Sequence, residues 1–244
     1  MKSLRLHEVV ACTANYSSFP SLRLPPLPIP SIICTATRRD LPCARDLNPS
    51  TLSRCISVSS PMSTDQNKHE YSVWAVPPED VSQRLRCLMA GLRAEFGGPE
   101  FDPHITVVGL VSLTEEDALS RFRAACEGLK EYEAVVEGVG TGSIYWQCVY
   151  LLIKPTEEVV AASDHCCRHF GYLRSSPYMP HLSLVYGDIS DEEKKKAQEK
   201  ANILDDNLNC LSFKISRLVL CKTPLGDLTT KSWEVVLDYT LNAV

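Results

Sequence analysis

Two short segments of this chain carry the same arrangement of residue types, with their histidines 77 residues apart (104 to 181). Each has proline, histidine, an aliphatic residue, a hydroxyl residue and a second aliphatic residue: Pro103-His104-Ile105-Thr106-Val107 and Pro180-His181-Leu182-Ser183-Leu184. Alternate side chains of a strand face opposite sides. Each segment, as a strand, would therefore present one imidazole and one hydroxyl to a common side and aliphatic side chains to a core.

Two imidazoles that meet across a cleft can share acid and base work. Histidine has an unperturbed pKa of about 6.5, so near neutral pH one ring can be neutral while the other is protonated. The opening of a cyclic phosphate needs this division, because one group takes a proton from attacking water and another protonates the departing oxygen. Thr106 and Ser183 could donate hydrogen bonds to the nonbridging phosphate oxygens. The scheme requires no metal and no cofactor.

The elements expected to hold the motifs alternate between strands and helices. A strand is predicted at 70–76, with Tyr71, Val73 and Ala75 on one side, and a helix follows to Phe96, where two glycines end it. Further strands are expected at 102–110, 133–140, 147–153, 180–187, 211–221 and 231–239, and helices at 114–130, 156–170 and 190–201. Adjacent strands without helical crossovers favour an α+β fold. The repeated order of motif strand and helix predicts two related lobes that face each other.

Charge divides the chain into two regions. Residues 1–61 carry seven Lys and Arg against three Asp and Glu, which leaves 18 against 27 for residues 62–244. The head is rich in Ser, Thr and Pro, so we interpret it as an extension, either a chloroplast transit peptide or upstream sequence before a natural start at Met62 of a cytoplasmic protein. An acidic body disfavours a stable nucleic-acid complex and suits a small phosphorylated substrate. No apolar run is long enough to span a membrane.

Cysteines and a histidine pair raise two further hypotheses. The eleven cysteines show no paired spacing typical of a disulfide framework, although a bridge between Cys126 and Cys221 stays open. His165 and His169 stand at i and i+4, as metal ligands on a helix do. No third ligand lies at a fitting spacing, so a helix with buried cysteines is the preferred interpretation.

The chain resembles the plant cyclic phosphodiesterases of the two-histidine phosphoesterase superfamily, relatives of the bacterial LigT-type proteins. The resemblance covers about residues 70 to 239 and is carried by the two histidine motifs and the segments 71–75 and 177–184. It implies that residues 62–244 form a bilobal domain, with two antiparallel sheets around a central cleft and helices outside. It also implies hydrolysis of ADP-ribose 1″,2″-cyclic phosphate to ADP-ribose 1″-phosphate, after tRNA splicing, and of nucleoside 2′,3′-cyclic phosphates to 2′-phosphates.

The same resemblance implies the roles of individual residues. His104 and His181 are the catalytic pair, with the base role assigned to His181, and Thr106 and Ser183 bind the phosphate. Tyr186 is favoured as a phosphate or water contact, although period two puts it on the opposite face of the strand from Ser183 unless the strand ends there. By its residue type, and not from the resemblance, Trp146 could stack on a base, although ordinary packing is the preferred interpretation.

Other functions remain open at this point. A phosphodiesterase acting on RNA ends and a noncatalytic nucleotide-binding or RNA-binding module are the alternatives. We expect a monomer whose partner is a small cyclic nucleotide.

Overall fold

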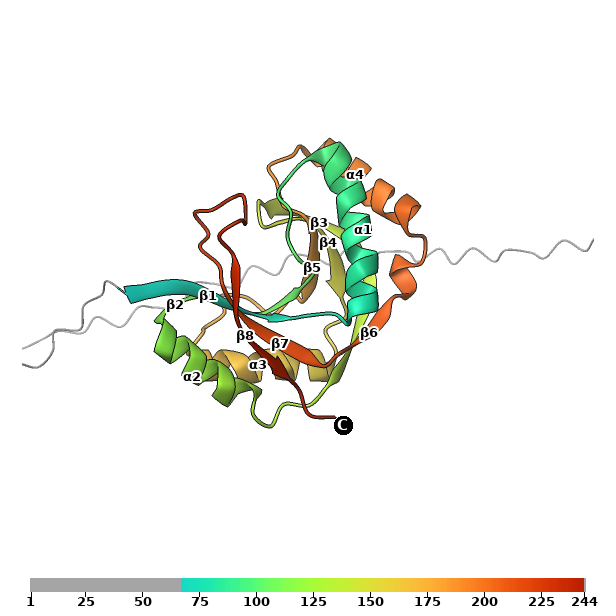
Figure 1. Ribbon diagram of the computed structural model, residues 1–244. Coiled ribbons are helices and arrows are strands. Elements are labelled where there is room, and N and C mark those ends of the chain that lie inside the picture. The colour runs from blue at the N-terminus through green and yellow to red at the C-terminus, as the bar shows by residue number, and fades with distance from the viewer. Residues whose placement is uncertain (1–66, 244) are drawn as a thin grey trace, which may run out of the picture. The chain divides into compact units, whose positions relative to one another are not determined.

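The computed structural model describes residues 67–243 (Figure 1), so the extension expected at 1–61 lies outside the described residues. The elements in chain order are β1 (Lys68–Ala75), α1 (Glu79–Phe96), β2 (Ile105–Thr114), α2 (Glu115–Cys126), β3 (Tyr132–Ile144), β4 (Gln147–Ile153), α3 (Glu157–Phe170), β5 (His181–Val185), α4 (Asp191–Leu204), the 3-10 turn η2 (Leu208–Cys210), β6 (Ser212–Ile215), β7 (Arg217–Lys222) and β8 (Glu234–Thr240). The paired strands are antiparallel, which confirms the predicted α+β class. None of the helices in this region is long and apolar enough to cross a membrane.

The eight strands follow the spatial order β6-β3-β4-β5-β2-β1-β7-β8. The first four and the last four form two halves, and β2 and β5 join them through one register pair, Ile105 with Leu182. The two sheets that the resemblance implied are therefore two halves of one curled sheet. Because Ile105 and Leu182 are the residues after the two histidines, the junction brings the two motifs side by side.

Helices cover the two halves in pairs (Figure 1). One pair is α1 with α4, where α1 packs against β5 and α4 against β3 and β4. The other is α2 with α3, where α2 packs against β1, β2 and β7 and α3 packs against β2 and β3. Each helix pair buries apolar side chains against the sheet, such as Leu85 and Leu92 of α1 and Phe122 of α2. Burial of these faces holds each half of the sheet rigid around the junction.

Local sequence signals set the helix ends. The Thr114 side chain accepts a hydrogen bond from the Asp117 backbone N–H, and Ser190 forms a full capping box with Glu193. Helix α2 ends at Cys126 rather than at the predicted 130, because the chain turns through Gly128 at a φ of 81°.

The strand predicted at 211–221 is wrong as a single element. It is broken at Ser216 into β6, which pairs with β3, and β7, which pairs with β1 in the other half. The side chains that join the main core change phase there, from Phe213 and Ile215 to Leu218 and Leu220, and the opposite face of β7 is buried separately against Trp74. A strand that keeps one period of two cannot make that change, so the chain crosses between the halves at this point.

The seven cysteines of the described region are free thiols. Cys126 and Cys221 are both fully buried and unpaired, so the bridge left open by the sequence does not form. They act as small apolar side chains of the core.

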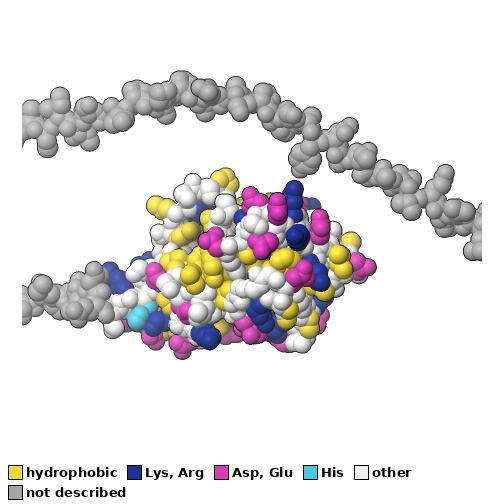
Figure 2. Space-filling model, turned by 90° about the horizontal axis from the view of Figure 1, so that it is seen from above, with side chains coloured by type: hydrophobic (Ala, Val, Ile, Leu, Met, Phe, Trp, Pro, Cys, Tyr) yellow, Lys and Arg dark blue, Asp and Glu magenta, His cyan; other side chains and the backbone are white. Residues whose placement is uncertain are grey.

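Charged side chains surround hydrophobic ones on the face of the molecule seen from above. Figure 2 shows a central group of hydrophobic side chains bordered by acidic and basic ones. No basic stripe dominates this face, in keeping with the acidic balance of the body.

Candidate active site

A cavity of about 370 Å³ opens at the junction of the two halves. All six residues predicted from the sequence line it: His104, Thr106, Trp146, His181, Ser183 and Tyr186. They come from the strand β2 and the residue before it, from β5 and the residue after it, and from the β3–β4 turn. The structure thus brings together side chains that are up to 82 residues apart (104 to 186).

Strand alternation places the motif side chains as predicted. Ile105 and Val107 of β2, and Leu182 and Leu184 of β5, are buried in the core. The histidines and hydroxyl residues between them face the cavity. Because each strand has its apolar side fixed in the core, a slip of one residue would expose that side, so the register of both motifs is strongly held.

The two histidines make matching hydrogen bonds. His104 Nδ1 donates to the Asp102 carbonyl at 2.7 Å, and His181 Nδ1 donates to the Met179 carbonyl at 3.0 Å. Each partner is the carbonyl two residues earlier. A carbonyl can only accept, so the proton of each neutral ring stands on Nδ1 and Nε2 is an acceptor. Both rings therefore lie in the tautomer that can take a proton at Nε2.

Burial makes both rings resist protonation. The pKa of His104 is lowered to about 4, chiefly by burial and also by the charge that His181 would carry, while the Asp102 carbonyl opposes the shift. Burial also lowers the pKa of His181, and the Met179 carbonyl opposes it. Both imidazoles are therefore uncharged at neutral pH.

Trp74 fixes the plane of His104. The two rings are stacked, with their centroids 3.7 Å apart and 13° between their planes, and Phe101 meets His104 edge-on at 6.3 Å. Trp74 reaches this place because it stands opposite Thr106 in the β1–β2 register. The face of an indole also stabilises a cation next to it, so the stack favours the protonated form of His104 once a negative charge arrives.

Ser183 and Tyr186 lie side by side in the cavity lining. Ser183 Oγ donates to the Trp146 carbonyl at 3.2 Å. Strand β5 ends at Val185, so Tyr186 is released from the alternation that would have turned it away, and it stacks on Phe101 at 3.8 Å. Burial raises the pKa of the Tyr186 phenol, which stays a hydrogen-bond donor at neutral pH.

Tyr178 adds a second tie between the two motif segments. Its phenol, three residues before His181, donates to the Thr106 carbonyl at 2.8 Å. The β2–β5 junction has a single register pair, so this hydrogen bond helps to hold the two histidines at a fixed separation.

One wall of the cavity is aromatic. Trp146 and Trp233 lie 5.2 Å apart with 33° between their planes, and Trp233 lies 5.6 Å from Trp74. These are the three tryptophans of the whole chain. Sequence reasoning missed the site roles of Trp74 and Trp233. For Trp74 the strand alternation could have indicated its place, since period two puts it on the face opposite the buried Tyr71 and Val73. Trp233 follows a long loop, so no periodicity indicated that it would line the cavity.

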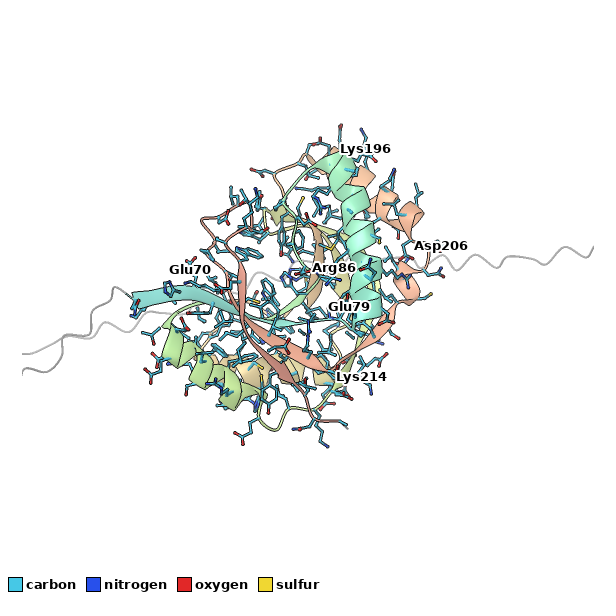
Figure 3. The ribbon with its side chains drawn as sticks, in the orientation of Figure 1. Glu70, Glu79, Arg86, Lys196, Asp206 and Lys214 are labelled. Carbon is cyan, nitrogen blue, oxygen red and sulfur yellow. The ribbon has the colours of Figure 1, made fainter. Side chains whose placement is uncertain are left out.

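The loop between β7 and β8 joins the two halves beside the cavity. Tyr145 of the β3–β4 turn donates to the Leu228 carbonyl at 3.0 Å, and Glu70 of β1 accepts from the Leu225 N–H at 2.8 Å. Glu70 is labelled at the base of this loop in Figure 3. These contacts hold Trp233 in the wall.

Charge is nearly absent from the cavity lining. Among the described residues that line it, none is Asp, Glu, Lys or Arg. An anionic group bound there would meet only imidazoles, hydroxyls and one glutamine side chain, which suits a substrate with one negative charge at the reacting centre.

The histidine pair of α3 lies elsewhere. The rings of His165 and His169 are 4.7 Å apart, and in the part of the chain that the structure describes no three metal-ligating side chains come together.

Comparison with known proteins gives concordant matches. Residues 70–241 match a family model described as cyclic phosphodiesterase-like protein. A cyclic phosphodiesterase of Arabidopsis thaliana is 50% identical over 175 residues, which are 72% of this chain and 97% of that protein. A 2′,3′-cyclic-nucleotide 3′-phosphodiesterase of Yarrowia lipolytica is 25% identical over 213 residues, with 68% of this chain and 96% of that protein covered.

A solved structure shares the fold. A crystallised phosphoesterase superposes with a TM-score of 0.50 at 10% identity, covering 72% of this chain and 99% of that one. At that identity the match concerns the arrangement of strands and helices alone.

Proposed function

Because the chain belongs to the cyclic phosphodiesterase family and is a hydrolase, we propose that it hydrolyses two kinds of cyclic phosphate. One is ADP-ribose 1″,2″-cyclic phosphate, opened to ADP-ribose 1″-phosphate downstream of tRNA splicing. The other is a nucleoside 2′,3′-cyclic phosphate, opened to the 2′-phosphate. The observation that supports this proposal most strongly is the pair of imidazoles held in the same tautomer, each by the carbonyl two residues earlier, at one cavity.

The reaction divides between the two rings. Nε2 of His181 takes a proton from a water molecule, whose oxygen forms a bond to phosphorus. The bond from phosphorus to one ribose oxygen breaks, and that oxygen takes a proton from Nε2 of His104. His181 suits the base role because it is the more exposed ring, which water reaches. His104 suits the acid role because the bound phosphate anion raises its pKa and Trp74 stacks on its cationic form.

Hydroxyl groups bind the phosphate as its charge increases. Thr106 and Ser183 flank the two histidines, and the Tyr186 phenol lies next to Ser183. Each donates one hydrogen bond to a nonbridging oxygen, for which the Ser183 hydroxyl turns its single hydrogen from the Trp146 carbonyl to the bound phosphate. Fixed donors are worth most where charge develops in a dry site, because they need no reorganisation at the moment of reaction.

The aromatic wall accounts for the organic part of a nucleotide. Trp146 and Trp233 offer ring faces to a base, and such stacking is tolerant of base identity. The proposal therefore includes broad acceptance of nucleoside 2′,3′-cyclic phosphates.

Turnover of the full chain with both substrates, in the presence of EDTA, tests the function. We expect hydrolysis of 2′,3′-cyclic AMP to the 2′-phosphate and of ADP-ribose 1″,2″-cyclic phosphate to the 1″-phosphate, with products assigned by phosphorus NMR. A folded protein that binds these compounds without turnover would instead establish the noncatalytic binding module. Exclusive turnover of oligonucleotide ends would establish an RNA-end phosphodiesterase.

A further inference from the structure

A second chamber continues from the active-site cavity on the side of His181. It has a volume of about 470 Å³ and shares six lining residues with the cavity: Thr106, Gly109, Ile144, Gln147, Tyr172 and His181. The segment that leads from α3 to the second histidine motif supplies most of the rest, from Arg174 to Met179. A molecule whose phosphate lies between the two histidines can therefore extend directly into this chamber.

Arg174 is the one charged residue among those that line the second chamber. Its side chain is 21% exposed, so a ligand can reach it. Asp164, its ion-pair partner on α3, does not line the chamber. The chamber therefore presents the guanidinium to a ligand, while the Asp164 carboxylate that pairs with it lies outside the lining.

Contacts within the protein fix the Arg174 guanidinium, and some of its N–H groups remain available to a ligand. It donates to the Asp164 carboxylate, to Ser163 Oγ at 2.5 Å and to Cys167 Sγ at 3.3 Å, and it lies over the Tyr178 ring at 4.6 Å. These bonds use three of the five N–H donors of an arginine. The Nε–H and one Nη1–H remain, so the fixed guanidinium can still donate hydrogen bonds to phosphate oxygens.

A diphosphate needs such a group, and the active-site cavity does not provide it. Its described lining contains no Lys or Arg, so a substrate with two further phosphates beyond the cyclic one would find no cation there. Ser175 and Ser176, next to Arg174, add hydroxyl donors to the second chamber.

We propose that the chamber around Arg174 is a subsite for the diphosphate group of a substrate whose cyclic phosphate lies between His104 and His181. The inference rests on the proposed function and predicts that its two substrates differ in their use of the second chamber. ADP-ribose 1″,2″-cyclic phosphate carries a diphosphate and occupies both chambers. A nucleoside 2′,3′-cyclic phosphate has none and uses only the first cavity and its aromatic wall.

Comparison of the two substrates in one variant tests the subsite. Arg174→Gln in the full chain is expected to lower kcat/KM for ADP-ribose 1″,2″-cyclic phosphate about tenfold more than for 2′,3′-cyclic AMP, as the loss of a hydrogen bond to a charged group predicts. The change should lie mainly in KM, because the diphosphate is distant from the reacting phosphorus. Arg174→Lys keeps the charge but not the planar set of N–H donors. Its ratio of the two kcat/KM values should therefore lie between the ratio of the wild type and that of Arg174→Gln. Arg168→Gln, an exposed arginine of α3 outside the chamber, is the matched control and should leave the ratio of the two substrates as in the wild type.

Binding of inorganic pyrophosphate provides a readout that needs no turnover. In titration calorimetry the wild-type chain should bind pyrophosphate more tightly than inorganic phosphate, and Arg174→Gln should remove the difference. Equal losses for both substrates, or pyrophosphate binding that Arg174→Gln leaves intact, would overturn the subsite while hydrolysis of 2′,3′-cyclic AMP still supported the proposed function. If the wild-type chain did not hydrolyse 2′,3′-cyclic AMP at all, the proposed function would be refuted. The pyrophosphate titration would still show whether the subsite exists.

Discussion

Replacing His104 or His181 by alanine is expected to reduce kcat for 2′,3′-cyclic AMP by about 100- to 10,000-fold, the range that a positioned acid or base contributes. Each substitution removes one of the two groups proposed to transfer protons, which the junction of β2 and β5 brings to the cavity. KM should change less than kcat, because the phosphate is still held by hydroxyl groups. Steady-state kinetics of each single variant measure the effect.

The double variant sharpens this test. If the two rings act in one concerted step, removing both should cost little more than removing one, because either loss already disables the reaction. His169→Ala, an exposed histidine of α3, is the matched control and should retain wild-type kinetics. Near-normal turnover in either of the cavity variants, with the fold intact by circular dichroism, would show that the histidines are not the acid and the base.

Removal of the hydroxyls proposed to bind the phosphate should produce the second largest loss of kcat. Thr106→Val and Ser183→Ala are each expected to lower kcat by about 100- to 1000-fold, the cost of one donor aimed at developing negative charge. The reason is that both hydroxyls come from the same strands as the histidines and so share their fixed position relative to the phosphate.

Ser82→Ala is the matched control for the hydroxyl experiment. Ser82 and Ser183 are both buried serines that donate to a backbone carbonyl, Ser82 to that of Pro77 at 3.0 Å. Ser82 lies on α1 outside the cavity lining, so its loss should affect stability but not kcat. A similar fall in kcat for Ser82→Ala and Ser183→Ala would mean that the effect of Ser183 is structural.

The histidine motifs and their strand faces could be predicted because strand alternation is a local property. Ile105 and Leu182 are apolar between polar neighbours, and that pattern alone orients His104 and His181 to one side. That both sides meet at one cavity followed from the repetition of the motif. The single register pair that joins the halves is a contact between distant residues, and the sequence pattern contains no information on it.

Other parts of the site depend on tertiary structure. Tyr186 faces the cavity because β5 ends one residue earlier, and strand ends are the least certain part of any sequence-based prediction. Trp233 and Arg174 come from loops without periodicity, so their approach to the cavity depends on long-range packing. The break at Ser216 left no mark in the sequence pattern, because residues 218–221 are apolar on both faces and such a run is equally typical of one long strand.

The pH dependence of kcat/KM for 2′,3′-cyclic AMP, measured in the presence of EDTA, tests the two-histidine account most directly. This ratio reports the free enzyme, which is competent when the pair of rings holds one proton. Below both pKa values no base remains, and above both no acid remains. Burial lowers the pKa of His104 to about 4, and it also lowers the pKa of His181 from its ordinary 6.5. The plot of kcat/KM against pH is therefore expected to be bell-shaped, with its maximum on the acid side of pH 6.5. A rate that keeps rising through pH 8, or that EDTA abolishes, would contradict it.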